Sequence, residues 1–217
     1  MILLYTEASP FARKCRLCIA ELGAGQDIAL RDVGAVSPLA ANAAASAQAP
    51  LGKIPVLVRP GQAALYDSPV ICEYLDAVWQ GSLFPADGEA RWRALALQAL
   101  ADGAMETAVA LRYEAVFRGN GSGDDPWVVR QMARLTSAVD AMARAVADFA
   151  PAPTIGELSV ASALGYLDLR FEEIAWRRGQ AALAAWFDSF AARPSMQSTA
   201  PTLCPTSHQQ EMDHEPG

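Results

Sequence analysis

Residues 5–18, YTEASPFARKCRLC, bring several side chains that could do chemistry into one short stretch. Ser9 follows an apolar run and directly precedes a segment with helical periodicity, so its hydroxyl lies at the start of the expected helix. The first N–H groups of a helix lack intrahelical partners and carry partial positive charge, which favours a bound anion. Ser9 therefore has two interpretations: a hydrogen-bond donor to such an anion, or an ordinary helix N-cap.

The hydroxyl groups of Tyr5 and Thr6 compete with Ser9 for a chemical role. A phenol can donate to an anion as a serine can, but Tyr5 also ends an apolar run and suits a position in the core. Thr6 lies next to the turn as well. The residues alone leave this choice open.

Cys15-Arg16-Leu17-Cys18 has the spacing of a redox CxxC motif. In a redox site the first cysteine precedes its helix, where the sulfur meets the positive end of the helix dipole. These two cysteines lie inside the expected helix and share the periodicity of Phe11 and Leu22. We therefore expect them to pack in the core.

Two later helix starts carry capping residues. Asp67 or Ser68 caps one helix and Pro69 lies in its first turn. Thr154-Ile155-Gly156-Glu157 has the S/T-x-x-E pattern of a capping box, so we expect a structural role there.

The elements that must position these groups divide the chain into an α/β half and an all-helical half. The first half is expected to hold strands and helices in the order β-α-β-(α)-β-β-α, with strands at 1–5, 27–33, 54–58 and 63–66, a weak helix within 34–50, and helices from Pro10 to about 22 and from 68 to 78. Residues 27–33 alternate as a half-buried strand does. The second half is expected to hold helices near 89–118, 127–149, 155–170 and 180–192. We predict domains at 1–78 and 89–197, a linker at 79–88 and a flexible tail at 198–217.

Composition narrows the class of protein. Hydrophobic residues make up 52% of the 217, which supports a packed core, and the net charge of −7 disfavours nucleic acid or an anionic membrane as partner. The four cysteines form no disulfide framework, and Cys204, His208 and His214 match no standard zinc spacing, so no metal is expected. No signal peptide and no membrane span are expected, which makes a cytoplasmic location the default.

Four motifs in order, SPFARK, PLGKIPVL, YDSPVICEYLD and TIGELSVASAL, resemble the cytosolic glutathione transferases, particularly bacterial ones with a Ser-Pro-Phe active-site turn. The resemblance implies a thioredoxin-like domain followed by a helical domain, usually as a homodimer. It implies glutathione as co-substrate, a small-molecule electrophile as second substrate, and no metal. Because Ser9 and Ala12 stand where redox relatives carry cysteine, disulfide-reductase activity is not expected.

The resemblance also implies roles for individual residues. Ser9 donates a hydrogen bond to the glutathione thiolate and is the catalytic residue, with Phe11 of the same turn in the substrate site. The remaining glutathione contacts are a cis-proline at Pro55, the backbone of Ile54 for the cysteinyl part, Lys53 for the glycine carboxylate, Asp67 for the γ-glutamyl ammonium and Ser68 for the γ-glutamyl carboxylate. For Lys53 the alternative is a solvated surface lysine.

The second-substrate pocket is expected between the Ser9 turn and the helix at 89–118. Met105, Val109, Arg112 and Tyr113 lie along about one face of that helix, which suits a pocket, the core or a dimer interface. Asp102 could reach the glutathione of a neighbouring subunit. Two other functions remain open: a non-catalytic binding or regulatory protein, and a glutathione peroxidase.

Overall fold

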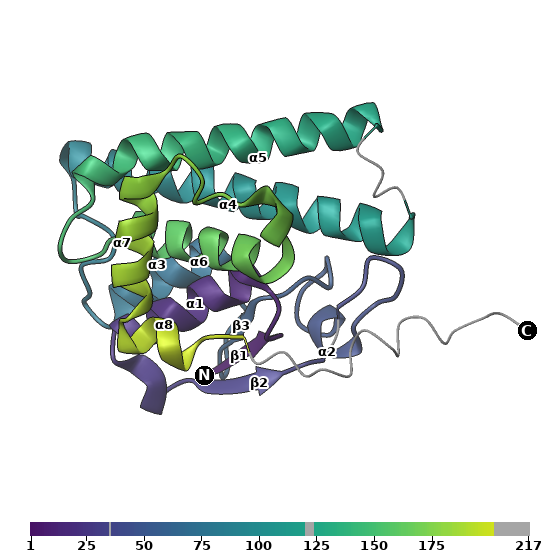
Figure 1. The fold of residues 1–217 in the computed structure, drawn as a ribbon. Helices are drawn as coiled ribbons and strands as arrows, with labels where there is room; N and C mark the ends of the chain where they lie inside the picture. Colours follow the sequence, from purple (N-terminus) through teal and green to yellow (C-terminus); the bar gives the residue numbers. More distant parts are fainter. Residues whose placement is uncertain (35, 120–123, 202–217) are drawn as a thin grey trace, which may run out of the picture.

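A computed structural model describes residues 1–34, 36–119 and 124–201 (Figure 1). Within these ranges a small mixed sheet with helices against it precedes a bundle of helices, which confirms the predicted α/β half followed by a helical half. Most of the predicted tail, including Cys204, His208 and His214, lies outside the described residues.

The sheet has the strand order β2-β1-β3. The central strand β1 (Ile2–Tyr5) pairs in parallel with β2 (Ala29–Asp32) and antiparallel with β3 (Val56–Val58). The parallel connection requires a crossover, which the helix after β1 supplies. This places the carboxyl end of β1 and the start of that helix at one edge of the sheet.

The predicted strand at 63–66 is reduced to a single bridge. Leu57 and Leu65 exchange backbone hydrogen bonds of 3.0 and 2.9 Å. The carbonyl of Ala63 instead accepts from Arg59, whose Nε and Nη2 lie 3.0 and 2.7 Å away. The ladder therefore does not extend along the returning segment.

The strand predicted at 27–33 forms, but the prediction that it is half-buried is wrong. All four residues of β2 are exposed, although Ile28 just before the strand is 2% exposed. β2 is an edge strand at the lower margin of the molecule in Figure 1. The alternation of apolar and polar residues in the sequence could not show that this strand stays exposed at the edge of the sheet.

Helices α1 (Pro10–Glu21) and α3 (Ser68–Val78) pack against each other, and α2 (Ala43–Ser46) is a short segment in the loop between β2 and β3. The sulfur atoms of Cys15 and Cys72 lie 3.8 Å apart between α1 and α3. Burial raises the pKa of the Cys15 thiol. The prediction that the CxxC segment belongs to the core is confirmed, because both of its cysteines are fully buried.

The second half consists of α4 (Gly88–Phe117), α5 (Pro126–Ala145), α6 (Ile155–Arg170), α7 (Ala181–Ala191) and α8 (Pro194–Ser198). Figure 1 shows α6 between α4 and α1, and α6 packs against both. The sequence predicted that the helix near 180–192 stops at Arg193-Pro194, which is confirmed. It missed α8, in which Pro194 occupies the first helical position of a new helix.

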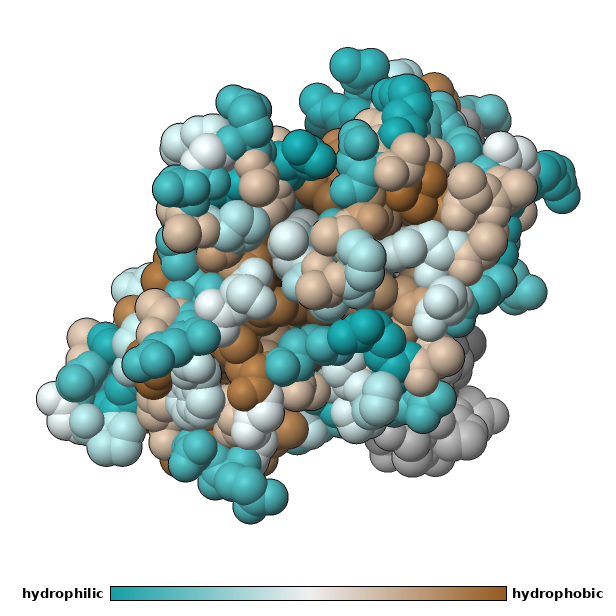
Figure 2. Space-filling model, turned by 90° about the vertical axis from the view of Figure 1, so that its left-hand side faces the viewer, coloured by the Kyte–Doolittle hydropathy of each residue, from teal (hydrophilic) through white to brown (hydrophobic). Residues whose placement is uncertain are grey.

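α4 is long and apolar enough, by length and composition, to cross a membrane. This is weak evidence, because core helices of soluble proteins meet the same criterion, and α4 packs along α5 and α6. The face drawn in Figure 2 mixes hydrophilic and apolar residues and shows no uninterrupted apolar band.

The predicted capping box at the start of α6 is confirmed. The N–H of Gly156 donates to Thr154 Oγ1 at 3.2 Å, and the N–H of Thr154 donates to Glu157 Oε2 at 2.8 Å. Replacing Thr154 with alanine should lower the free energy of unfolding by about 1 kcal/mol, because backbone donors lose their partner. Urea unfolding measures that loss, while activity per folded molecule should stay unchanged; a variant of normal stability would contradict the prediction.

The end of α1 is tied to the start of α8 by Glu21. Its carboxylate accepts from Arg193 Nε at 3.0 Å and Nη2 at 2.7 Å, and from the Ser195 hydroxyl. The hydrogen bonds from Arg193 lower the pKa of Glu21, and burial opposes them only in part.

Acid should therefore weaken the fold through Glu21. With a lowered pKa in the folded state, the unfolded chain binds this proton at higher pH, so the contribution is complete above about pH 4.3, the ordinary value for Glu, and is lost as pH falls towards the folded pKa. Urea midpoints measured across this range should fall less steeply for Glu21→Gln than for the natural chain. Parallel curves would contradict the assignment.

Candidate active site

Ser9 lies in the turn between β1 and α1 as the N-cap of the helix. Its φ of −79° and ψ of 121° are extended, and Pro10 occupies the first turn. Ser9 Oγ accepts a hydrogen bond from the N–H of Ala12 at 3.2 Å. This bond uses a lone pair and leaves the hydroxyl proton available to a ligand, so capping and donation can coexist.

The phenol of Tyr5 is already engaged. Its hydroxyl donates to Glu7 Oε1 at 3.1 Å, and the other oxygen of Glu7 lies 3.0 Å from Arg16 Nη1. The Arg16 guanidinium also stacks over the Tyr5 ring at 4.8 Å. Burial and then the charge of Glu7 raise the pKa of Tyr5. Thr6 contributes its carbonyl, which accepts from the N–H of Ser9 at 3.1 Å.

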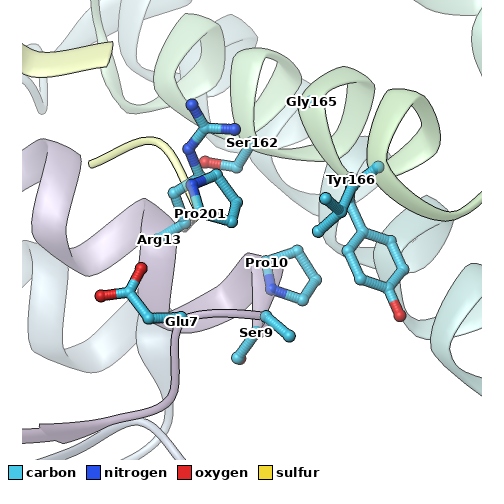
Figure 3. Close-up of a pocket in the computed structure, with 10 residues that line it drawn as sticks. Glu7, Ser9, Pro10, Arg13, Ser162, Gly165, Tyr166 and Pro201 are labelled. Atoms are coloured by element: carbon cyan, nitrogen blue, oxygen red, sulfur yellow. The ribbon is translucent and has the colours of Figure 1, made fainter. Parts of the chain in front are cut away.

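A cavity of about 10 Å³, room for about one water molecule, lies beside Ser9 against α6 (Figure 3). Ten residues from the β1–α1 turn, α1, α6 and the chain after α8 line it: Glu7, Ala8, Ser9, Pro10, Arg13, Ser162, Gly165, Tyr166, Leu169 and Pro201. The Ser9 turn thus faces the helical half, where a second substrate is expected.

Arg13 and Tyr166 are among several cavity residues that sequence reasoning missed. The Arg13 side chain is buried and its Nη2 donates to the Met196 carbonyl at 3.3 Å. A Cβ on Gly165 would lie 2.5 Å from Arg13 Nη1, so a larger residue at this point of α6 would displace the Arg13 guanidinium. Neither the arginine nor the glycine could be paired from sequence, because 152 positions separate them along the chain.

The segment before β3 leaves its backbone open. The Ile54–Pro55 peptide is cis, as the resemblance implied. Ile54 is half-buried and makes no backbone hydrogen bond within the described part of the chain. Lys53 beside it is exposed. The free Ile54 groups can pair with an extended peptide.

Asp67 and Ser68 stand at the start of α3. Asp67 is the N-cap residue, but its exposed carboxylate makes no capping hydrogen bond. Ser68 is the first helical residue and is 2% exposed, so its N–H belongs to the unpaired group at the helix start. One end of α3 therefore offers a carboxylate for a cation and free N–H groups for an anion.

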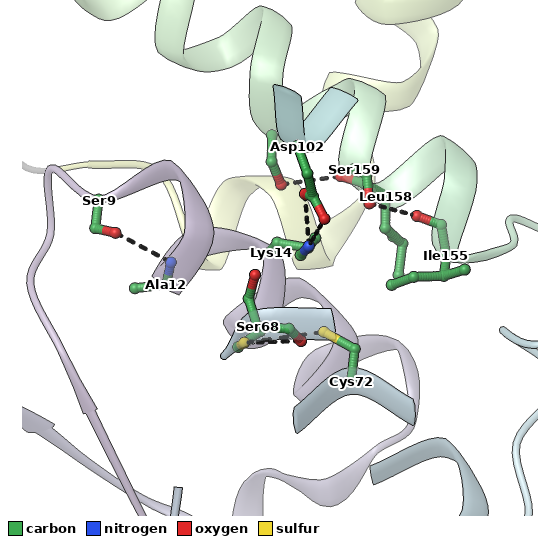
Figure 4. A network of polar contacts seen from close by, with 11 residues as sticks. Ser9, Ala12, Lys14, Ser68, Cys72, Asp102, Ile155, Leu158 and Ser159 are labelled. Carbon is green, nitrogen blue, oxygen red and sulfur yellow. Dashed lines mark hydrogen bonds and ion pairs between the residues drawn. The ribbon is translucent and has the colours of Figure 1, made fainter. Parts of the chain in front are cut away.

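A buried ion pair that sequence reasoning missed joins α1 to α4 (Figure 4). Lys14 is fully buried, and its Nζ lies 2.6 and 2.7 Å from the two oxygens of Asp102. The signal in the sequence was a lysine four residues before Cys18, within the buried stripe of α1. Because both of its oxygens accept from Lys14, Asp102 is held within its own chain.

The α4 residues expected at the second-substrate pocket lie together. Met105 is 1% exposed, while Val109, Arg112 and Tyr113 are half-buried. Tyr113 stacks on Phe117 with ring centroids 5.8 Å apart. Met105 therefore belongs to the core, whereas the three later residues of this helix face remain partly exposed.

Comparisons with known proteins agree with this arrangement. A family model for the glutathione S-transferase N-terminal domain matches residues 8–78. A glutathione transferase family member from Pseudomonas fluorescens Pf-5, solved with bound glutathione, is 40% identical, with a TM-score of 0.86 over 93% of this chain and 99% of its own.

Two further relatives extend the comparison. A structure from the same organism, with bound S-(propanoic acid)-glutathione, is 39% identical, with a TM-score of 0.84 over 94% of this chain and 100% of its own. An uncharacterized GST-like protein of Escherichia coli, YibF, is 28% identical over 93% of this chain and 98% of its own length. With 40% identity to a family member across nearly the whole chain, and with the fold of that member, the protein belongs to the glutathione transferase family.

Proposed function

We propose that this protein is a cytoplasmic, homodimeric glutathione transferase that conjugates the glutathione thiolate to a small-molecule electrophile. One observation carries the proposal: the Ser9 hydroxyl lies at the positive end of α1 and donates to no other described residue, while the neighbouring Tyr5 phenol donates to Glu7. The two Pseudomonas fluorescens structures contain glutathione and a thioether of glutathione. These ligands correspond to a substrate and a product of the proposed reaction, and so support it.

The energetic task of Ser9 is to favour the ionised sulfur. A free thiol has a pKa of about 8.5, and lowering it by about 2 units requires about 2.7 kcal/mol of preferential stabilisation of the thiolate. A hydroxyl donor and a helix N-terminus both act in that direction. The thiol proton leaves to solvent; the sulfur then forms a C–S bond with an electrophilic carbon, and a leaving group such as chloride departs with the bonding electrons.

The proposed glutathione contacts use backbone and side-chain groups that have no partner within the described part of the chain. The free Ile54 backbone beside Pro55 pairs with the cysteinyl residue, and Phe11 contacts substrate from the Ser9 turn. Ser68 and the start of α3 bind the γ-glutamyl carboxylate, Asp67 its ammonium, and Lys53 the glycine carboxylate. In this proposal residues 1–78 form the glutathione-binding domain, 79–88 the linker and 89–197 the helical domain.

Exposed apolar residues support the homodimer. Tyr66, Val70 and Val78 lie at or on α3 and Trp92 on α4, with exposed fractions of 42, 46, 48 and 62%. Sedimentation of the full chain should give twice the monomer mass of 23.0 kDa.

Turnover of an aryl halide with glutathione tests the function. Catalysed formation of the thioether supports it. Binding of glutathione without turnover, unchanged in Ser9→Ala, would instead indicate a non-catalytic binding or regulatory protein. Activity only towards organic hydroperoxides would indicate a peroxidase at the same site.

Replacing Asp67 with asparagine should raise the KM for glutathione about tenfold and leave kcat nearly unchanged, because the lost ion pair is made equally in the ground and transition states. Steady-state kinetics with varied glutathione measures the effect. Asp87→Asn is the matched control, since Asp87 is also an N-cap without a capping hydrogen bond, at the start of α4. A fall in kcat, or equal effects of both variants, would contradict the assignment.

A further inference from the structure

We propose that Arg16 of α1 is a positioning residue for the catalytic turn, acting through Glu7. Its ion pair with Glu7 holds the turn that carries Ser9, and it cancels a negative charge that would otherwise oppose the glutathione thiolate. The inference rests on the proposed function, to which it adds a pair of residues that keeps the bound thiol acidic.

Glu7 lies inside the turn that carries Ser9. The N–H of Ser9 donates to the Thr6 carbonyl at 3.1 Å, and this hydrogen bond closes the turn around Glu7. Glu7 lines the same cavity as Ser9, and its side chain is 29% exposed (Figure 3). A displacement of Glu7 would therefore displace the backbone that places the Ser9 hydroxyl.

Arg16 holds Glu7 from the helix that Ser9 caps. It follows Ser9 by seven positions, nearly two helical turns, so it lies on the same side of α1, and helical side chains lean towards the N-terminus. Its Nη1 donates to Glu7 Oε2 at 3.0 Å, and its guanidinium lies 4.8 Å from the centre of the Tyr5 ring. Because Arg16 is only 7% exposed, water and salt screen this ion pair weakly.

A carboxylate beside the cavity bears directly on the chemistry proposed for Ser9. A neighbouring negative charge raises the pKa of an acid, so Glu7 alone would oppose ionisation of a thiol bound in the cavity. The Tyr5 phenol donates to Glu7 at 3.1 Å but brings no charge. Arg16 supplies the positive charge that offsets the carboxylate, so the turn is held without a net negative charge against the thiolate.

The other titratable groups at the cavity do not add negative charge. Among the described residues, three titratable side chains line it: Glu7 from the turn, Arg13 from α1 and Tyr166 from α6. Burial raises the pKa of Tyr166 to about 12, so its phenol stays neutral. With Arg16, two guanidinium groups face one carboxylate, which leaves one positive charge in excess. A thiolate at Ser9 balances that charge.

A purely structural role for the ion pair predicts a different result from charge compensation. If the pair only held the turn, loss of either member would misplace Ser9 and raise the pKa of the bound thiol in both cases. With charge compensation the two members have opposite effects, because Arg16→Gln leaves a bare carboxylate and Glu7→Gln leaves a bare guanidinium. The amide oxygen of Glu7→Gln can still accept from Tyr5 and Arg16, so this change removes charge with little change of shape.

Titration of the thiolate absorbance of glutathione bound to the full chain tests the inference. Arg16→Gln should raise the pKa of the bound thiol by about 1 unit, Glu7→Gln should lower it by about 1 unit, and the double variant should lie near the natural chain. Arg16→Lys keeps the positive charge and should also stay near the natural value.

The ion pair between Glu21 and Arg193 is the matched control. It joins the same two residue types at the opposite end of α1, roughly 18 Å from Ser9 along the helix and beyond the reach of an exposed charge at physiological salt. Glu21→Gln and Arg193→Gln should both leave the pKa of the bound thiol unchanged.

The outcomes separate this inference from the proposed function. A thiol pKa that shifts in the same direction in Arg16→Gln and Glu7→Gln, or that stays unchanged in either, would overturn the inference alone. If Arg16→Gln does not fold, Glu7→Gln decides by itself, and a raised or unchanged pKa there would overturn the inference. If the natural chain binds no glutathione, or binds it with a thiol pKa near the free value of about 8.5, the proposed function fails as well.

Discussion

Ser9→Ala should lower kcat/KM for an aryl halide about 100-fold, the usual effect of removing one hydrogen-bond donor from a developing or stable anion in an enclosed site. The pKa of the bound glutathione thiol should rise towards the value of the free thiol, about 8.5, without reaching it, because the start of α1 still favours the thiolate. Ultraviolet absorbance of the bound thiolate, measured against pH, reports this pKa directly. The same shift should appear in the pH profile of kcat/KM.

Two controls separate donation from capping. Ser9 also accepts from Ala12, so its alanine variant should lose about 1 kcal/mol of stability in addition to activity. Thr154→Ala removes a helix cap of the same kind at the start of α6 and should leave the thiol pKa unchanged. Ser9→Thr keeps a hydroxyl and should restore a low pKa. An unchanged thiol pKa in Ser9→Ala would show that another group ionises the sulfur.

The parts of the site that were predictable from sequence depend on neighbours in the chain. Ser9 and Pro10 mark the start of α1 because an N-cap and a proline at the first helical position are local preferences. The capping box of α6 and the interior position of Cys15 and Cys18 follow from spacing alone. Such features follow from residues that are close together in the chain, which is why a single sequence shows them.

The parts that were missed depend on contacts between distant segments. A lysine is normally a surface residue, so the burial of Lys14 becomes intelligible only when α4 brings Asp102 to it. The exposure of β2 and the loss of the predicted strand at 63–66 likewise reflect which elements happen to pack beside them. Tyr166 entered no prediction because a tyrosine in a buried helix is ordinary until its cavity is seen.

The ion pair between Lys14 and Asp102 should have the largest effect on stability of any contact between the two halves. Asp102→Asn leaves a fully buried ammonium without its counter-charge, and Lys14→Met leaves a carboxylate that is 15% exposed without its cation. Each change should cost about 3–5 kcal/mol, the usual loss when one member of a buried pair is removed. Urea unfolding of the full chain measures the cost.

The double variant Lys14→Met/Asp102→Leu distinguishes a buried pair from two independent contacts. Because desolvating two charges costs much of what their attraction returns, replacing both with apolar side chains should restore most of the stability lost in either single variant. Glu73→Gln, which removes the exposed partner of Arg91, is the matched control and should cost at most about 1 kcal/mol. If the two single losses simply added in the double variant, the ammonium and the carboxylate would not be acting as a pair, and α1 would be held to α4 by packing alone.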